Sequence, residues 1–412
     1  MRIETLDILR CPFCGGRLEL VDTHFHRRHG DDIVDGILGC HCCVFPIVAG
    51  IPIMHLEPAA VAARELVEAG RPDAAAKKMF GLEDDSQEAR FEEIAASPNA
   101  TYRDTVDALG AGFEGGYFLY RFSDPTYIVA DAVVRAVGAT TLERGGRAID
   151  VCGGSGHLTR SLLDLTPAPP IVADLYFAKL WLARRFTAPG CEPVCCDANA
   201  PLPFASRVFQ AVVCSDAFHY IWTKRLLASE MMRISGDDGA VAVTHAHNAQ
   251  QWNPSAGMPL PPPAYRDLFE PMHPRLFAES ALLAEIVARG AVDLSQRHTP
   301  DALDADLALT IVAATRDDVF RMHTGSARPA ARGEFRVNPL YVAEPDGERV
   351  RLRLRFPSED YEQEYAASRT YLADDVSVDR GALAALPASR LPAGLADLAR
   401  RRVVLDLPVR YY

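Results

Sequence analysis

Residues 147–159 limit the folds open to this chain more sharply than its composition does. The segment begins with an apolar run, places three glycines (Gly153, Gly154 and Gly156) within four positions, and predicts a helix over residues 159–165. An apolar strand that ends in glycines and opens a helix is typical of parallel sheets that present a nucleoside or phosphate-like ligand to a helix N-terminus. Glycine also lets a ligand lie directly against the backbone.

Four further short apolar runs follow, and each ends in a polar residue. They cover residues 171–174, 193–197, 208–216 and 239–244. Helical patterns over residues 177–186 and 223–234 lie between them. This alternation predicts a parallel sheet with ligand-binding residues at the carboxyl ends of its strands. An acid at the end of the second strand, here Asp174, can accept both hydroxyls of a ribose, although such an acid can also cap a helix.

The residues Asp150-Val-Cys-Gly-Gly-Ser-Gly156 resemble the D-x-G-x-G-x-G signature of class I S-adenosylmethionine-dependent methyltransferases, and the resemblance covers residues 126–316. It implies an α/β fold with a Rossmann-like, doubly wound, seven-stranded mixed sheet. Residues 291–294 and 307–314 are expected to form its last two strands, the latter antiparallel. The cofactor residues implied by the resemblance are Asp150, Cys152, Gly153, Gly154, Gly156, Asp174, Leu175, Asp197, Ala198 and Ser215.

One residue departs from this signature. Cys152 replaces its first glycine, at a position that usually approaches the cofactor closely. A binding or scaffold protein that has lost transfer is therefore one alternative to an enzyme.

Three histidines are the candidate catalytic residues. His219 follows the fourth apolar run, and His245 and His247 follow the fifth. The donor in methyl transfer is already activated, so the protein chiefly supplies alignment and, for a hydroxyl or amine acceptor, a base. Imidazole suits proton removal near neutral pH. The sequence leaves open which histidine acts, and His219 equally fits a packing role. Asp216 could orient a base or cap the next helix, and the cap is the expected role.

Two cysteine knuckles near the N-terminus predict a zinc site. They are Cys11-Pro-Phe-Cys14 and Cys40-His-Cys-Cys43. Four thiolates can enclose Zn²⁺ tetrahedrally and leave no open position, so the metal is expected to be structural.

The segment that follows these knuckles, residues 45–54, resembles the tail of Trm112-like zinc ribbons. In that family the second knuckle is C-x-x-C or C-x-C, so either Cys42 or Cys43 is the fourth ligand, and the spacing favours Cys42. The loop histidines His24, His26 and His29 could compete as metal ligands, but they are expected to be solvated.

The chain divides into four expected parts. These are the zinc ribbon (residues 1–57), a helical lid or linker (58–125), the methyltransferase domain (126–316, with a possible substrate-binding insertion at 248–274) and a small α+β region of unknown role (317–412). Gly115-Gly116 could hinge the lid and Tyr117 or Tyr120 could cover the cofactor. In the last part, Arg349, Arg351, Arg353 and Arg355 are expected on one strand face, either solvated or binding an acidic partner, before a helix over residues 383–402.

Composition restricts the partners. The 412 residues carry a net charge of −12, which argues against a large nucleic-acid interface. No apolar stretch approaches the ~20 residues that span a bilayer, and no signal-peptide core is present, so a cytoplasmic protein is expected. The predicted activity is methylation of an O, N or C atom of a small molecule or biosynthetic intermediate. An RNA methyltransferase is the second alternative. The oligomeric state cannot be derived from the sequence.

Overall fold

The structure, a computed structural model, describes residues 1–82, 84–110, 115–143, 145–253, 257–325 and 333–412. Its centre is a seven-stranded sheet with the order β11-β13-β10-β9-β6-β7-β8. The strands are β6 (Ala148–Val151), β7 (Ile171–Asp174), β8 (Glu192–Cys195), β9 (Phe209–Ser215), β10 (Ser235–His247), β11 (Arg275–Ala278) and β13 (Ala308–Ala314). β6 to β10 run parallel, and β13 is antiparallel to both of its neighbours. The predicted seven-stranded mixed sheet is thus confirmed.

The predicted identity of one edge strand is wrong. Residues 291–294 were expected in the main sheet, but β12 (Ala291–Asp293) pairs with β14 (Met322–Thr324) in a separate two-stranded sheet. The edge strand is β11, which pairs with β13. Its residues Leu276 and Ala278 are good helix formers directly before a helix, so local propensity hides a strand that tertiary pairing creates.

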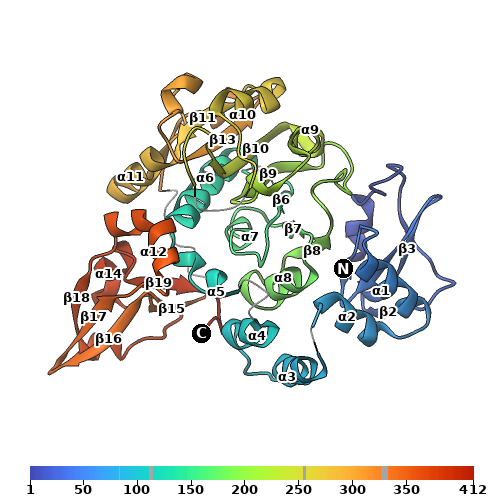
Figure 1. The fold of residues 1–412 in the computed structure, drawn as a ribbon, viewed down its shortest axis with the longest axis horizontal. Helices are drawn as coiled ribbons and strands as arrows, with labels where there is room; N and C mark the ends of the chain where they lie inside the picture. Colours follow the sequence, from blue (N-terminus) through green and yellow to red (C-terminus); the bar gives the residue numbers. More distant parts are fainter. Residues whose placement is uncertain (83, 111–114, 144, 254–256, 326–332) are drawn as a thin grey trace.

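Helices cover both faces of this sheet (Figure 1). They are α6 (Pro125–Thr141), α7 (Thr159–Leu162), α8 (Phe177–Leu182), α9 (Lys224–Ile234), α10 (Pro262–Phe269) and α11 (Glu279–Arg289). α6 and α11 pack on alanine-rich positions of β10, whereas α9 and α10 bury the opposite face with residues such as Val241 and Val243. This alternation along each strand is what a sheet buried on both sides requires.

The N-terminal ribbon extends the sheet at its β8 edge. Its strands are β1 (Glu19–Leu20), β2 (Arg27–His29), β3 (Asp32–Gly39), β4 (Val44–Val48) and β5 (Ile51–Pro52). The backbone N–H of Met54 donates to the Cys195 carbonyl at 2.6 Å, and Ile53 forms a parallel bridge with Cys195. Leu9 and Phe45 share one buried cluster with Ile149 of β6. The ribbon therefore covers a strand edge that would otherwise be open.

Among the described residues, five α-helices lie between the ribbon and α6. They are α1 (Pro58–Glu68), α2 (Pro72–Phe80), α3 (Asp85–Ala96), α4 (Tyr102–Leu109) and α5 (Gly115–Phe118). Asp84 caps α3 by accepting from the Gln87 N–H at 2.8 Å. Pro72 fits the first helical position of α2, and Asp73 lies in the first turn of that helix.

The C-terminal region is an α+β unit on the opposite side of the sheet from the ribbon (Figure 1). It contains β15 (Glu334–Val337), β16 (Tyr341–Asp346), β17 (Arg349–Leu354), β18 (Asp375–Asp379), β19 (Val404–Leu407), α12 (Glu359–Glu364), α13 (Arg380–Leu383) and α14 (Ala396–Arg400). Arg351 and Arg353 are exposed on β17 and pair with Asp375. These arginines therefore lie on a solvent-exposed face of the strand, which was one of the two predicted arrangements. The predicted helix over residues 383–402 is wrong, because Pro387 and Pro392 interrupt it.

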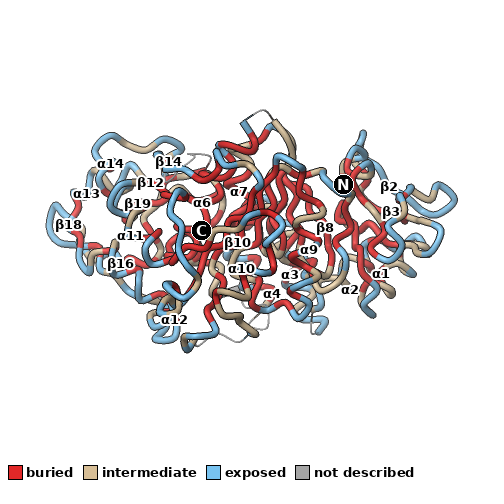
Figure 2. The backbone as a smooth tube through the Cα atoms, turned by 90° about the horizontal axis from the view of Figure 1, so that it is seen from above, coloured by how far each residue is buried: buried red, intermediate tan, exposed pale blue. Residues whose placement is uncertain are grey.

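Buried residues concentrate in the central sheet, and both outer units are more exposed (Figure 2). In the described part of the chain, every helix lacks either the length or the apolar character needed to cross a membrane.

Candidate active site

A cavity of about 690 Å³ lies at the carboxyl ends of the central strands. Its walls come from the loops after β6, β7, β8 and β9, from α5 and the turn that follows it, and from the end of α12. Nine of the ten predicted cofactor residues line it: Asp150, Cys152, Gly153, Gly154, Asp174, Leu175, Asp197, Ala198 and Ser215. The tenth, Gly156, belongs to the glycine loop but does not line the cavity.

The glycine loop has no room for side chains at two of its positions. A Cβ on Gly153 would lie 2.7 Å from the Asp150 carboxyl carbon, and one on Gly156 would lie 2.8 Å from Ala183. Gly154 has a φ of 53° and donates its N–H to Asp174 Oδ2 at 2.9 Å. The main chain of the loop therefore forms the floor of the cavity.

Asp150 carries a buried oxygen without a partner. Its Oδ2 accepts from the Thr159 hydroxyl at 2.7 Å, whereas Oδ1 has no hydrogen-bond partner among the described residues. Burial raises the pKa of Asp150 to about 7. A buried carboxylate oxygen with an unused acceptor site suits an ammonium group. This fits the amino group of S-adenosylmethionine.

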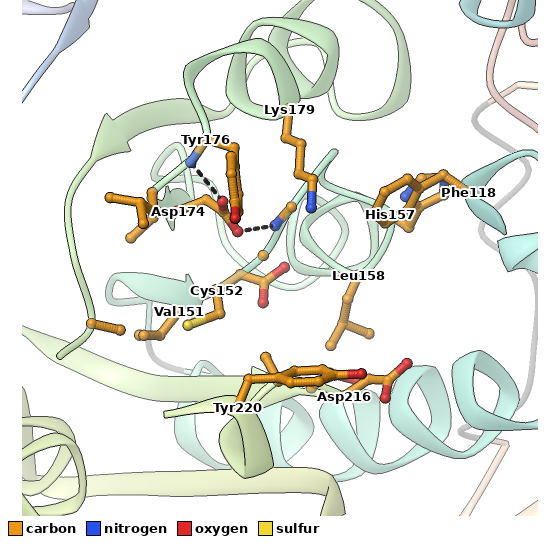
Figure 3. Close-up of a pocket in the computed structure, with 18 of the residues that line it drawn as sticks. Phe118, Val151, Cys152, His157, Leu158, Asp174, Tyr176, Lys179, Asp216 and Tyr220 are labelled. Atoms are coloured by element: carbon orange, nitrogen blue, oxygen red, sulfur yellow. Dashed lines mark hydrogen bonds between the residues drawn. The ribbon is translucent and has the colours of Figure 1, made fainter. Parts of the chain in front are cut away.

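Two more aspartates follow the next two strands. Asp174 accepts from the Tyr176 N–H at 2.9 Å and from Gly154, as Figure 3 shows, and burial raises its pKa. Asp197 accepts from the backbone and side chain of Asn199 at 2.8 and 3.1 Å. Both carboxylates face the same cavity. They can hold the ribose and the adenine of one nucleoside if it lies across β7 and β8.

Beyond β6, the other end of the cavity is built around Asp216. Tyr117 and Arg121 donate to its Oδ2 at 2.7 and 2.9 Å. Burial opposes ionisation, but the cations of His245 and Arg121 lower the pKa of Asp216 to about 2. The expected helix-capping role of Asp216 is wrong, because no side chain caps the 3-10 helix Phe218–Tyr220.

The three candidate catalytic histidines lie together behind this end, and none of them lines the cavity. His245 Nδ1 contacts Glu279, and its Nε2 lies 3.9 Å from Asp216 Oδ1. Burial disfavours the cation, but Glu279 and Asp216 outweigh it and raise the pKa of His245 to about 9. At neutral pH this ring is an imidazolium and has no lone pair with which to remove a proton.

His219 and His247 stack against each other, with ring centroids 3.6 Å apart and planes 13° apart. Burial lowers their pKa values to about 4 and about 3. Their ligand atoms and one oxygen of Asp216 lie within 4.8 Å of one another. Nearly parallel ring planes, however, do not direct two nitrogen lone pairs at one ion, so this group is poorly shaped for a metal. The catalytic roles of the three histidines stay predictions.

The helical segment and the C-terminal unit complete the walls. Tyr117 and Phe118 line the cavity, as the lid prediction anticipated for Tyr117, whereas Tyr120 does not. Phe118 stacks near His157, and both are held by Tyr411, whose hydroxyl lies 2.7 Å from His157 Nε2 and from the Phe118 carbonyl oxygen. The described residues of the 248–274 insertion do not line the cavity, and residues 254–256 lie outside the described residues.

Several lining residues were missed by sequence reasoning: Arg121, His157, Lys179, Tyr220 and Glu364. Figure 3 shows Lys179 and Tyr220 on opposite sides of the cavity. Helical spacing from Tyr117 could have found Arg121, and the place of His157 directly after the glycine loop was a second available signal. Glu364 had no such signal, because it comes from the C-terminal unit.

The ribbon brings four cysteine sulfurs together. The Sγ atoms of Cys11, Cys14, Cys40 and Cys42 lie within 4.8 Å of one another. This donor set fits a tetrahedral Zn²⁺. Cys43 is not in the group, which favours Cys42 as the fourth ligand. The loop histidines His24, His26 and His29 are exposed, as expected.

Comparison with known proteins agrees with this geometry. Residues 148–239 match the family model of a methyltransferase domain. No curated protein sequence matches the chain significantly.

Many solved structures are similar to this chain, among them the following three. One is a candidate methyltransferase from Bacillus halodurans (14% identity, 44% of this chain and 98% of that chain, TM-score 0.31). Another is a chain in the complex between the Trm112 methyltransferase activator of Haloferax volcanii and a candidate methyltransferase (17% identity, 44% and 90%, TM-score 0.33). The third is geranyl diphosphate C-methyltransferase from Streptomyces coelicolor, with S-adenosyl-L-homocysteine bound (14% identity, 42% and 71%, TM-score 0.31).

The family match, the strand order and the glycine loop agree with one another. The chain carries a class I S-adenosylmethionine-dependent methyltransferase domain.

Proposed function

We propose that the cavity binds S-adenosylmethionine with its adenosine over β7 and β8 and its methionine over β6. The observation that carries this proposal is that Asp150 lines the same cavity as Asp174 and Asp197, and that its Oδ1 has no hydrogen-bond partner among the described residues. In this arrangement Asp150 binds the amino group, Asp174 the ribose hydroxyls, and Asp197 with Ala198 the adenine edge. Cys152, Gly153 and Gly154 offer their main chain to the methionine part.

The acceptor end then lies over β9, because the sheet order places β9 on the far side of β6 from β7 and β8. The cofactor supplies a methyl group already activated by the positive sulfur. The residues of the chain align the acceptor and exclude water. Tyr117, Arg121 and Asp216 form the polar wall there, and Asp216 is kept ionised by its cationic neighbours.

We further propose a small-molecule acceptor. A cavity of about 690 Å³ can hold the cofactor and a compact second ligand. The net charge of −12 opposes a long contact with a phosphate backbone. The ribbon is proposed to bind one structural zinc and to act as a Trm112-like module within the same chain.

The test has two steps. Calorimetry should first detect 1:1 binding of S-adenosylmethionine. Transfer of a labelled methyl group should then be followed in a bacterial extract that has been separated into a small-molecule fraction and an RNA fraction. Label in the small-molecule fraction supports the proposal. Label only in RNA would establish the RNA alternative, and cofactor binding without any transfer would establish the scaffold alternative.

A further inference from the structure

The charged residues that line the cavity are mostly acidic. Among the described residues, five carboxylates face two cations: Asp150, Asp174, Asp197, Asp216 and Glu364 against Arg121 and Lys179. His157 does not add a charge, because burial lowers its pKa well below the usual value. S-adenosylmethionine contributes one net positive charge, which leaves the loaded cavity negative.

Four of the five carboxylates have a counterpart of their own, whereas Glu364 shares the more distant His245 cation, and burial and Asp216 together raise its pKa. Arg121 and the His245 cation neutralise Asp216. Lys179 acts electrostatically on Asp174. Under the proposed function, Asp150 and Asp197 face the amino groups of the cofactor. Within the part of the chain that the structure describes, Glu364 forms no ion pair, and its one hydrogen bond is from the Tyr365 hydroxyl at 3.2 Å.

Glu364 is held firmly at the acceptor end. It is the last residue of α12, and the next residue, Tyr365, is buried with its ring 5.8 Å from that of Tyr117. The C-terminal unit is fixed on the helical segment through Ser123, which donates to Asn338 Oδ1 at 2.9 Å and accepts from Tyr371 at 2.8 Å. The Glu364 side chain itself is exposed at the rim, where an acceptor can reach it.

We propose that Glu364 binds the acceptor nitrogen in its protonated form, and that the acceptor is a small molecule with a basic amine whose nitrogen is the methylated atom. This inference rests on the proposed function and adds to it the chemical class of the acceptor. A carboxylate beside the acceptor nitrogen also suits the reaction itself, because positive charge moves from sulfur to nitrogen during methyl transfer. The C-terminal unit thereby acts as the specificity element of the enzyme.

The acceptor ammonium R–NH₃⁺ gives one proton to Glu364 and becomes a neutral amine. The nitrogen lone pair forms the new N–C bond as the C–S bond breaks and its electron pair stays on sulfur. The products are R–NH₂CH₃⁺ and S-adenosylhomocysteine. Glu364, exposed at the rim, returns its proton to solvent.

The experiment needs no known acceptor. Sinefungin carries a protonated amine where the cofactor carries its methyl group, whereas S-adenosylhomocysteine is uncharged there. We expect the full chain to bind sinefungin more tightly, and Glu364→Gln to lower this preference about threefold or more. Glu359→Gln, which removes an exposed carboxylate from the same helix outside the cavity, should leave the ratio unchanged.

An equal ratio in the wild-type protein and Glu364→Gln would overturn the role of Glu364. If Glu364→Gln and Glu359→Gln both lower the preference for sinefungin, the cause is the overall negative charge of α12, and the specific role of Glu364 is also overturned. If neither ligand binds the wild-type protein, the proposed function itself fails. As a second readout, labelled methyl transfer to a panel of primary amines should exceed transfer to matched alcohols and carboxylic acids, and the reverse order would contradict an amine acceptor.

Discussion

Three non-glycine residues adopt positive φ angles around the cavity. Cys152, Asp216 and His245 have φ values of 58°, 53° and 53°, and they lie at or near the carboxyl ends of β6, β9 and β10. Such backbone strain costs on the order of 1–3 kcal/mol at each position and tends to concentrate at functional sites. The positive φ of Cys152 also explains why the family signature has glycine at this position, because glycine adopts this conformation without strain.

Changing Cys152 to Gly or to Ala should separate this strain from the loss of the thiol. Both variants remove the sulfur, but only alanine keeps a Cβ in the left-handed region. We expect Cys152→Gly to have a free energy of unfolding about 1 kcal/mol higher than Cys152→Ala in urea denaturation. An alanine variant as stable as the glycine variant would show that the positive φ carries no strain.

The raised pKa of Asp150 predicts that cofactor binding depends on pH. The carboxyl is half protonated near pH 7, because its pKa is about 7. An ammonium partner favours the ionised form, so S-adenosylmethionine affinity should rise with pH through 7 and level off above it. Below pH 7, binding should release up to one proton, which calorimetry in buffers of different ionisation enthalpy measures.

Asp150→Asn is the control for this assignment. The amide keeps the size of the side chain but cannot ionise, so the proton release should disappear and affinity should fall. Proton release that persists in Asp150→Asn would assign the titration to another group.

At the level of elements, the ribbon and the methyltransferase sheet stabilise each other. Met54 pairs with the β8 edge at Cys195, and Leu9 and Phe45 lie in the core of the sheet. The cysteine knuckles could be predicted from local spacing alone. Their docking on β8 could not, because it depends on contacts between segments about 140 residues apart.

Loss of zinc should therefore lower the thermal stability of the whole chain. Cys42→Ser removes one of the four grouped sulfurs, whereas the neighbouring Cys43→Ser leaves all four in place. We expect elemental analysis to find one zinc per chain in the wild-type protein and Cys43→Ser, and less in Cys42→Ser, whose melting temperature falls by several degrees. If Cys43→Ser is the variant that loses zinc, the fourth ligand is Cys43.

Elements with strong local signals were predicted, and those created by distant contacts were not. The strands before Asp174 and Asp216 follow apolar runs that stand out in the sequence. The edge strand β11 did not, because its short apolar sequence merges with α11. The role of Asp216 also could not be predicted, because it depends on distant contacts: its partners Tyr117 and Arg121 are almost 100 residues away.

For the whole molecule, the cavity is the place where three parts of the chain meet. The sheet supplies the predicted cofactor residues, the helical segment supplies Tyr117 and Arg121, and the C-terminal unit supplies Glu364. The glycine loop and the strand-end aspartates could be predicted because they lie within one stretch of regular βα pattern. The acceptor wall could not be predicted, because only the folded chain brings its residues together.

The central claim is that Asp174 holds a cofactor ribose in this cavity, and calorimetric titration with S-adenosylmethionine tests it most directly. Asp293→Ala is the matched control, because Asp293 also ends a strand and accepts an N–H two residues later, from Ser295 at 2.9 Å, but lies outside the cavity. We predict that Asp174→Ala weakens binding about tenfold or more, and that Asp293→Ala binds like the wild-type protein. Equal affinity in Asp174→Ala and the wild-type protein would contradict this account of the site.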